Sequence, residues 1–386
     1  MIEYEGKYNK AVFMGSELDE STTTQLYSFL NHPAFENSKI VIQPDAHAGS
    51  GVCVGFTMTM NKYIIPAVIG VDIACGVEVW NLNIKPKKWK EHRLKSLDEF
   101  IRENLPAGTG VVREIPLTEK EINKFSSGLY EKIVKTCEKM SLDKTRVIKG
   151  LGSLGSGNHY VAVECDENSW LNIHSGSRWF GYQVAAYHQD IARKNMKDEF
   201  KGASAFRGLE YLTEETGLQS YVDDMMVAQE YASLNRKTMA RLIIEQHFDK
   251  DMDAMDHIES VHNYINFEDK IIRKGAISAH EGERVIIPLN MRDGSILGVG
   301  KGNEDWNFSA PHGAGRKMSR TQAKKQITLS TYRSQITGAG IYSSCVSKKT
   351  LDEAPDAYKR ADVILNSVGD SVEITSQIKP VYNFKG

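Results

Sequence analysis

Within the segment GVDIACGVEVW, residues 70–80, a carboxylate and a thiol stand three positions apart in a glycine-flanked break of an apolar run. They belong to Asp72 and Cys75. A disulfide would require only a second thiol, whereas a metal site would require this acid, this thiol and several imidazoles from elsewhere in the chain. The chemistry of the pair therefore depends on which histidines the fold brings to it.

Three glycine-rich stretches each contain one histidine and further polar side chains. They are GLGSLGSGNHY with Asn158 and His159, NIHSGSRWFGY with His174 and Arg178, and SAPHGAGRKMSR with His312, Arg316 and Arg320. Two shorter segments are VHNYINF, with His262 and Asn263, and QPDAH, with Asp45 and His47. Small residues beside a histidine let backbone amides approach an anion or a metal-bound ligand. One such segment is usually only a turn, but the whole set predicts a shared site.

Composition limits the possible function classes. The chain has 386 residues, with 48 Lys plus Arg against 50 Asp plus Glu, so a polyanionic partner must be met by a local basic patch. Five cysteines without regular spacing do not indicate a disulfide framework and favour a reducing compartment. The apolar stretches are too short to span a bilayer. We therefore expect a soluble, untargeted protein of the cytoplasm with no membrane partner.

Strand-like and helix-like segments alternate without a regular order. Residues 39–47, 51–60 and 62–84 are rich in β-branched residues and predict strands, as do 284–290, 295–300 and 372–386. Residues 118–140 predict a helix that opens with a capping box, and residues 220–248 predict a longer one. The mixture predicts an α+β fold. No Pro/Ser-rich linker divides the chain, so a single domain over residues 1–386 is expected.

The two predicted helices each have a specific signal. Thr118 and Glu121 have the spacing of a capping box. The longer helix has apolar residues that share one side at helical spacing, which indicates a buried face: Tyr221, Met225, Ala228, Ala232 and Met239.

The motifs follow one another in the order found in the RtcB RNA ligase family, and the chain resembles a shorter, bacterial-type member over nearly its whole length. They are PDAHAGSG, GVDIACGV, GSLGSGNH, IHSGSR, HNY, RKGA, PLNMRDGS, HGAGR and the terminal KG. The resemblance implies mixed β-sheets around a central metal-containing cleft. It also implies ligation of an RNA 3′-phosphate or 2′,3′-cyclic phosphate end to a 5′-hydroxyl end, with GTP and two manganese ions.

The resemblance assigns a ligand set to the two metals. Asp72, Cys75 and His159 would hold one ion. Cys75, His174 and His262 would hold the other, so that the thiolate bridges the two. Mixed oxygen, nitrogen and sulfur ligation suits manganese, iron, cobalt or zinc, and manganese is the choice of the family.

The resemblance assigns the nucleophile to His312. Its neutral imidazole would attack the α-phosphorus of GTP and form a histidine–GMP intermediate. GMP would then pass to the RNA 3′-phosphate, and the 5′-hydroxyl would attack this activated end as GMP leaves.

Other positions match family contacts to nucleotide and RNA. Those on the nucleotide are, for the phosphates, Asn158 and Asn263; for the sugar, Ser295 and the backbone of Gly313, Ala314 and Gly315; and for the base, Tyr358 and Lys385. Asn290 is also expected at the nucleotide, but it stands where the family has a serine for the phosphate. Three arginines are expected to receive RNA phosphates through bidentate hydrogen bonds: Arg178, Arg316 and Arg320.

The chain also departs from the family pattern. Where a glutamate usually reads guanine, three residues after the histidine of GNH, this chain has Ala162. Glu164 lies on the same face of the expected strand but is displaced by about 6–7 Å, so it would replace that glutamate only with a shift of the backbone. Pro311 stands where cysteine is frequent, and Val261 where a second histidine is frequent. None of these changes removes a metal ligand or the nucleophile.

Two other function classes would use the same residues. A binuclear metallohydrolase acting on phosphate esters would activate water, and His312 would then donate a proton or bind phosphate without forming a covalent nucleotide. A non-catalytic relative would bind RNA ends without turnover. Within the ligase interpretation, RNA repair, tRNA splicing and end capping fit equally well. The resemblance allows an activating helper protein, and a monomer is the simplest expectation.

Overall fold

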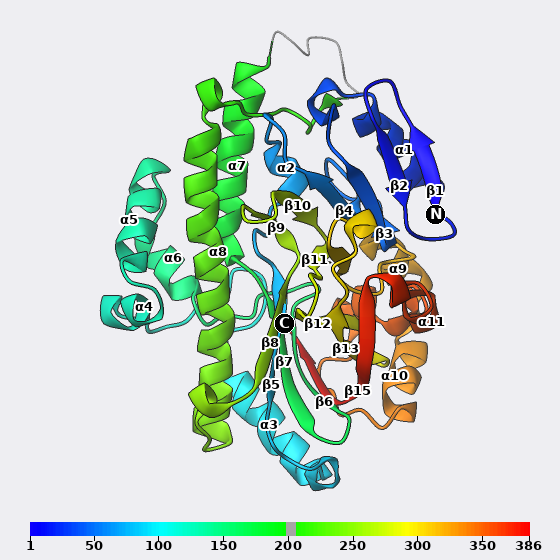
Figure 1. The fold of residues 1–386 in the computed structure, drawn as a ribbon. Helices are drawn as coiled ribbons and strands as arrows, with labels where there is room; N and C mark the ends of the chain where they lie inside the picture. Colours follow the sequence, from blue (N-terminus) through cyan, green and yellow to red (C-terminus); the bar gives the residue numbers. More distant parts are fainter. Residues whose placement is uncertain (198–205) are drawn as a thin grey trace.

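Two large β-sheets, one mixed and one antiparallel, form the centre of the molecule in a computed structural model, which describes residues 1–197 and 206–386 (Figure 1). The six-stranded sheet contains, in spatial order, β1 (Ile2–Glu5), β2 (Lys10–Phe13), β3 (Ile40–His47), β4 (Val54–Thr59), β10 (Ile271–Lys274) and β9 (Asn263–Asn266). All its pairs are antiparallel except β2 with β3.

The second sheet has seven strands, and a small ribbon lies between the two sheets. In order, the second sheet contains β12 (Arg284–Asn290), β13 (Gly294–Gly300), β15 (Val372–Lys385), β6 (Tyr160–Cys165), β7 (Ser169–Ser175), β5 (Gly76–Asn81) and β8 (His257–Val261). The ribbon pairs β11 (Ala276–Ser278) with β14 (Ser309–Pro311). This arrangement confirms the predicted α+β class.

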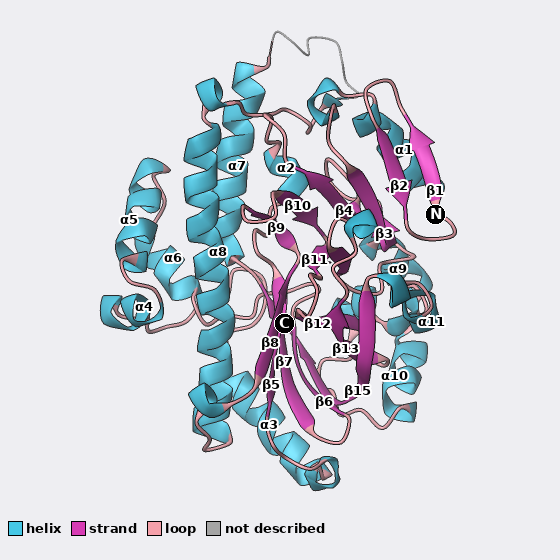
Figure 2. Cartoon of the chain, in the orientation of Figure 1, coloured by secondary structure: helices cyan, strands magenta, loops and turns pink. Residues whose placement is uncertain are grey.

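Helices cover the flanks of the sheets (Figure 2). The long helices α7 (Arg178–Asn195) and α8 (Leu218–Arg241) run side by side, and three shorter helices lie outside them: α4 (Glu119–Phe125), α5 (Leu129–Lys139) and α6 (Lys144–Gly150). The remaining helices are α1 (Glu20–Leu30), α2 (Pro66–Ile69), α3 (Glu91–Asn104), α9 (Arg320–Gln326), α10 (Leu329–Gly338) and α11 (Ala361–Leu365). Among the described residues, no helix has both the length and the apolar character needed to cross a membrane.

The single helix expected over residues 118–140 is two helices, so that prediction was wrong in extent. Its start is confirmed: the Glu121 amide donates to Thr118 Oγ1 at 3.3 Å, and the Thr118 amide donates to Glu121 Oε2 at 2.7 Å. The helix then ends at Phe125, and α5 begins after Gly128, whose φ of 74° is left-handed. A turn through SSG therefore interrupts the apolar stripe.

The segment 62–84 was expected to form strands, and its strand is β5, Gly76–Asn81. Residues Pro66–Ile69 form α2, with Pro66 in the first turn, where proline costs no hydrogen bond. The segment 220–248 agrees with expectation, since α8 runs to Arg241, continues as a π-helical turn, and buries all five residues of the predicted apolar face.

Candidate metal and nucleotide site

The ends of four neighbouring strands bring the predicted metal ligands together. Cys75 immediately precedes β5, His159 immediately precedes β6, and His262 immediately follows β8. His174 lies near the end of β7, where it pairs with Tyr160. These neighbouring strands are antiparallel, so the starts of β5 and β6 meet the ends of β7 and β8 at one edge of the sheet.

The ligand atoms form two triads that share one thiol. Cys75 Sγ lies 3.3 Å from His159 Nε2 and 3.3 Å from His174 Nε2, and His159 Nε2 lies 3.0 Å from an Asp72 carboxylate oxygen. The triads are Asp72, Cys75 and His159, and Cys75, His174 and His262; within each, the candidate ligand atoms lie within 4.8 Å of one another. The fold thus brings together all five predicted ligands.

The protonation of these groups suits a cation. Burial lowers the pKa values of His174 and His262 well below the usual range, which keeps both imidazoles neutral with lone pairs to donate. Burial and then the Asp72 charge raise the pKa of the Cys75 thiol, so a thiolate there needs a nearby cation. The Nδ1 atom of His262 is buried and has no hydrogen-bond partner within residues 1–197 and 206–386. A metal with mixed ligand preference fits this set of donors.

Backbone contacts orient the ligands. His159 Nδ1 donates to the Leu154 carbonyl oxygen at 2.9 Å, and this contact turns Nε2 toward Cys75 and Asp72. The fully buried Arg236 of α8 donates to the carbonyl oxygens of Ala74 and Ser175, each at 2.9 Å. Ala74 has a φ of 52°, so this guanidinium fixes a left-handed residue next to the thiol.

Burial opposes ionisation of Asp72, but the hydrogen bond and charge of His159 and the charge of Arg178 outweigh it and lower the pKa of Asp72 to about 2. The carboxyl is therefore anionic. It also accepts a hydrogen bond from the Ser177 amide at 3.1 Å. Arg178, at the start of α7, places its guanidinium 3.1 Å from His159 Nδ1 and does not line the main cavity.

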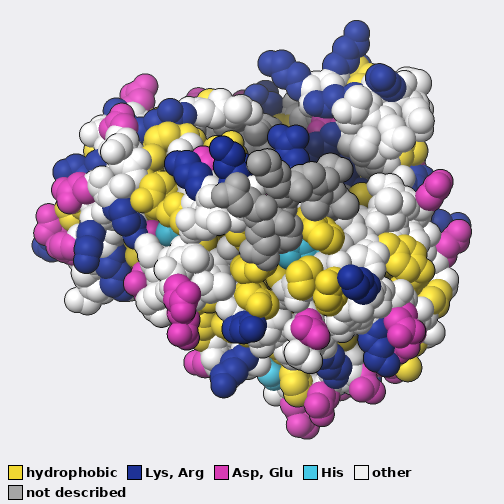
Figure 3. All heavy atoms as spheres, turned by 90° about the horizontal axis from the view of Figure 1, so that it is seen from above, with side chains coloured by type: hydrophobic (Ala, Val, Ile, Leu, Met, Phe, Trp, Pro, Cys, Tyr) yellow, Lys and Arg dark blue, Asp and Glu magenta, His cyan; other side chains and the backbone are white. Residues whose placement is uncertain are grey.

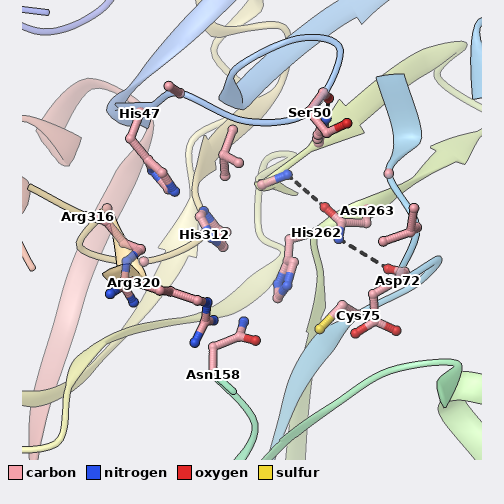
Figure 4. Close-up of a pocket in the computed structure, with 18 of the residues that line it drawn as sticks. His47, Ser50, Asp72, Cys75, Asn158, His262, Asn263, His312, Arg316 and Arg320 are labelled. Atoms are coloured by element: carbon pink, nitrogen blue, oxygen red, sulfur yellow. Dashed lines mark hydrogen bonds between the residues drawn. The ribbon is translucent and has the colours of Figure 1, made fainter. Parts of the chain in front are cut away.

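His312 stands next to the second triad and has a buried acidic partner. Its Nδ1 lies 2.7 Å from Asp45 Oδ2, and its ring centroid lies 4.8 Å from that of His262. Its side chain is 17% exposed and that of Asp45 is 0% exposed, so the ring reaches the cavity while its partner does not. Figure 4 shows the His312 and His262 rings adjacent, with Cys75 and Asp72 on one side and Arg316 and Arg320 on the other.

A cavity of about 1400 Å³ joins these features. Most of the predicted site residues line it: Asp72, Cys75, Asn158, His174, His262, Asn263, Asn290, His312, Gly313, Ala314, Gly315, Arg316, Arg320, Tyr358 and Lys385. His159, Arg178 and Ser295 lie behind this lining. A space of this volume is large enough for a nucleotide together with part of a second substrate.

Two of the predicted phosphate ligands have structural roles in their own loops. Asn263 donates to the Asp72 carbonyl oxygen at 3.1 Å and accepts from the Gly275 amide at 2.9 Å. Asn290 accepts from the amides of Arg292 and Asp293, each at 3.0 Å, and so closes a turn. Asn158 projects into the cavity below the rings of His312 and His262 in the view of Figure 4.

Glu353, a residue that the sequence did not indicate, is the common partner of Arg316, Arg320 and Lys385. Its carboxylate accepts hydrogen bonds from Lys385 at 2.8 Å, from Arg320 at 2.7 Å and from the Tyr358 hydroxyl at 2.6 Å. Arg316 donates to it at 3.3 Å. Burial opposes its ionisation, but the Lys385 and Arg320 charges lower the pKa of Glu353 to about 2. Arg316 and Arg320 are therefore partly neutralised within the protein.

Three functional positions were missed or left without a role in the sequence. Asp45 was noted in the PDAH motif together with His47, but no role was assigned to it. Its histidine partner in the structure is the distant His312 and not the neighbouring His47. Glu353 lies in the charged segment SKKTLDEAPD, which is typical of a solvated surface. Arg236 lies in a helix whose periodicity gave no hint of a buried charge.

Comparison with known proteins agrees with this geometry. Residues 25–386 match the family described as "tRNA-splicing ligase RtcB". The "RNA-splicing ligase RtcB" of Escherichia coli (strain K12) is 31% identical over 402 aligned positions, covering 96% of each chain. The "tRNA-splicing ligase RtcB" of Aeropyrum pernix is 27% identical, covering 90% of this chain and 88% of its own. "RNA-splicing ligase RtcB homolog 1" of Entamoeba histolytica is 29% identical, covering 90% and 80%. The family match and the E. coli relative show that this chain belongs to the RtcB family of ligases.

Proposed function

We propose that this chain is a GTP- and manganese-dependent RNA ligase that joins an RNA 3′-phosphate or 2′,3′-cyclic phosphate end to a 5′-hydroxyl end. The observation that carries the proposal is the pair of His312 and Asp45 beside two thiol-linked ligand triads in one cavity. RNA repair and tRNA splicing are the two settings for this reaction.

The first step uses the neutral imidazole of His312. Asp45 accepts a hydrogen bond from His312 Nδ1–H and holds the ring, so the Nε2 lone pair is free to attack the α-phosphorus of GTP. A P–N bond forms and pyrophosphate leaves. Because the Asp45 carboxylate is buried, it keeps one tautomer without competing with the phosphates for cations.

The second and third steps transfer GMP and join the ends. A terminal oxygen of the RNA 3′-phosphate displaces His312 from phosphorus, which regenerates the imidazole and gives an activated RNA end. The 5′-hydroxyl then attacks the RNA phosphorus, a phosphodiester forms and GMP leaves. A 2′,3′-cyclic phosphate must first be opened by water, because only the monoester offers the oxygen that accepts GMP.

Manganese would be held by the two triads, with Cys75 as the shared ligand. When bound, the ions supply Lewis acidity that stabilises negative charge on the reacting phosphates. The protein's own part is to keep His174 and His262 neutral and Asp72 anionic, as their pKa directions indicate.

RNA is expected at the open side of the cavity. Arg316 and Arg320 reach the cavity, and the side chain of Arg320 is 44% exposed, so it keeps donors for an RNA phosphate. Figure 3 shows Lys and Arg side chains around the hollow part of this face, while Asp and Glu side chains lie mostly toward its edges. This local basic patch would attract the RNA, whereas the net charge of −2 of the whole protein would not.

The proposal is tested by incubating the protein with manganese and α-labelled GTP. We expect label on the protein through an acid-labile, alkali-stable bond, and complete loss of label in His312→Ala. His92→Ala, at an exposed position on α3, is the matched control. Metal-loaded protein that takes no label but hydrolyses phosphate esters would instead indicate a binuclear hydrolase, and one that only binds RNA ends would indicate a non-catalytic relative.

A further inference from the structure

The helix α8 contacts the loops that carry the metal ligands through two consecutive side chains, Asn235 and Arg236. Both side chains are fully buried, and α8 packs against β7, which ends one residue after His174. Figure 1 shows α8 running beside the strands β5, β7 and β8. Because the ligands meet at the ends of these strands, α8 is placed to support the ligand set from outside it.

The amide of Asn235 joins the loop before β6 to the end of β7. Its Oδ1 accepts hydrogen bonds from the backbone amides of Gly152 at 2.7 Å and Ser153 at 3.1 Å. Its Nδ2 donates to Ser175 Oγ and to the Gly176 carbonyl oxygen, each at 3.1 Å. The side chain thus uses both its acceptor and its donor to keep the two segments at a fixed separation.

Ser175 extends this restraint to His159. Its Oγ donates to the Leu154 carbonyl oxygen at 3.0 Å, and the same carbonyl oxygen accepts a hydrogen bond from His159 Nδ1 at 2.9 Å. Such outer hydrogen bonds set the direction of a histidine ligand. A chain of hydrogen bonds therefore runs from Asn235 through Ser175 and Leu154 to a ligand of the first triad.

Arg236 adds the shared thiol to the same support. Its Nη1 donates to the carbonyl oxygens of Ala74 and Ser175, which are the residues next to Cys75 and His174. One nitrogen atom thus ties the backbone beside the bridging ligand to the backbone beside a histidine of the second triad. Together the two side chains of α8 act on both triads.

A carboxylate on β8 balances the buried guanidinium. Glu259 accepts a hydrogen bond from Arg236 Nη2. Burial opposes the ionisation of Glu259, but the charge and hydrogen bond of Arg236 outweigh it and lower the pKa. Burial and then the charge of Glu259 raise the pKa of Glu78, on β5, well above its usual range, so Glu78 stays neutral. Glu259 is therefore the counter-ion that a buried arginine requires.

We propose that Asn235 and Arg236 are positioning residues that set the affinity of both ion sites. They hold the ligand loops at their bound separation before an ion arrives, so that binding requires little further ordering. Neither side chain lines the main cavity, so they act through the backbone of the loops. This inference rests on the part of the proposed function that places one ion at each triad.

Metal titration tests the proposal without any substrate. Asn235→Ser removes the amide, and Arg236→Lys keeps the charge but loses the planar fork. We expect each variant to bind manganese about 10–100-fold more weakly than the parent, the usual cost of losing outer support for metal ligands. Electron paramagnetic resonance of the free manganese, during titration of metal-free protein, measures the affinity. Affinity like that of the parent in both variants would overturn the proposal.

Arg273→Lys is the matched control for the loss of a buried guanidinium. Arg273 is also fully buried, and it donates to the Asp269 carboxylate at 2.6 Å and to the Phe308 carbonyl oxygen at 3.2 Å. Its replacement should lower the unfolding temperature as Arg236→Lys does, but it should leave manganese affinity unchanged. An equal loss of manganese affinity in the two variants would indicate general destabilisation and would overturn the positioning role. Asn235→Ser keeps the guanidinium, so it keeps the test decisive if Arg236→Lys does not fold.

The result can be separated from that of the ligase proposal. If the two α8 variants bind manganese more weakly than the parent, but GTP leaves no label on the metal-loaded parent, the ligase proposal fails and the positioning role stands. If GTP labels the parent, and both variants bind manganese as tightly as the parent does, the positioning role fails and the ligase proposal stands.

Discussion

His312 Nδ1 lies 2.7 Å from the Asp45 carboxylate, although the two residues are 267 positions apart in the chain. The strand β3 supplies the acid, and the loop after β14 supplies the imidazole. A buried acid that fixes one tautomer and supports positive charge on the ring is the arrangement that activates a histidine.

Replacing Asp45 with asparagine should therefore slow histidine labelling while leaving GTP binding nearly unchanged. Asparagine keeps the size of the side chain but loses the charge that stabilises the ring, and comparable changes elsewhere cost about 10²–10⁴ in rate. Single-turnover labelling at saturating GTP measures the effect. Asp362→Asn, at a half-exposed position, is the control. A labelling rate close to that of the parent would show that Asp45 does not prepare His312.

Removing individual metal ligands should change the metal content in a defined pattern. Because Cys75 belongs to both triads, Cys75→Ala should lose both manganese ions, whereas His159→Ala and His262→Ala should each lose about one, from opposite triads. Equilibrium dialysis followed by elemental analysis gives the stoichiometry. Retention of both ions in Cys75→Ala would contradict a bridging thiolate.

A methyl group at Gly315 should disturb the nucleophile without touching it. Gly315 has a φ of +71°, and a Cβ there would collide with the backbone of Asp45. Gly315→Ala should lower the free energy of unfolding by about 1–3 kcal/mol and slow labelling, because the loop after His312 and the strand of its partner would move apart. Gly338, at the end of α10, has no heavy atom near the position of an added Cβ and a negative φ. Gly338→Ala is therefore the control, expected to be neutral or slightly stabilising. Equal effects of the two substitutions would exclude this explanation.

Glu353 should make stability depend on pH in the acidic range. Its pKa falls from 4.5 to about 2 on folding, so its contribution is fully present above pH 4.5 and is lost as the pH falls through about 2. The difference in unfolding free energy between the parent and Glu353→Gln should shrink by on the order of 3 kcal/mol over that interval. Chemical denaturation at several pH values measures it, with Glu373→Gln as an exposed control. A difference independent of pH would show that Lys385 and Arg320 do not hold the ionised form.

The fold class could be predicted from the mixture of strand-like and helix-like segments, which is a local signal. The glycine-flanked histidines predicted only a shared site, and the ligand set came from the motifs that the chain shares with the RtcB family. The division of residues 118–140 into two helices was not predicted, because helical spacing continues through the glycine turn at Gly128. Glu353 was also not predicted. Its burial results from Lys385, Arg320 and Tyr358, which come from distant segments, and no local pattern reports such an assembly.

The separation of Asp72 from His262 along the chain determines when a metal can be acquired. A nascent chain that ends at β5 contains only Asp72 and Cys75 of the five candidate ligands, and neither triad can be completed until later strands pair with β5. Metal loading would thus follow β-sheet assembly, and bound ions would link β5, β6, β7 and β8. A manganese-starved cell would then contain folded but thermally weaker molecules, whose melting temperature rises with the free metal concentration.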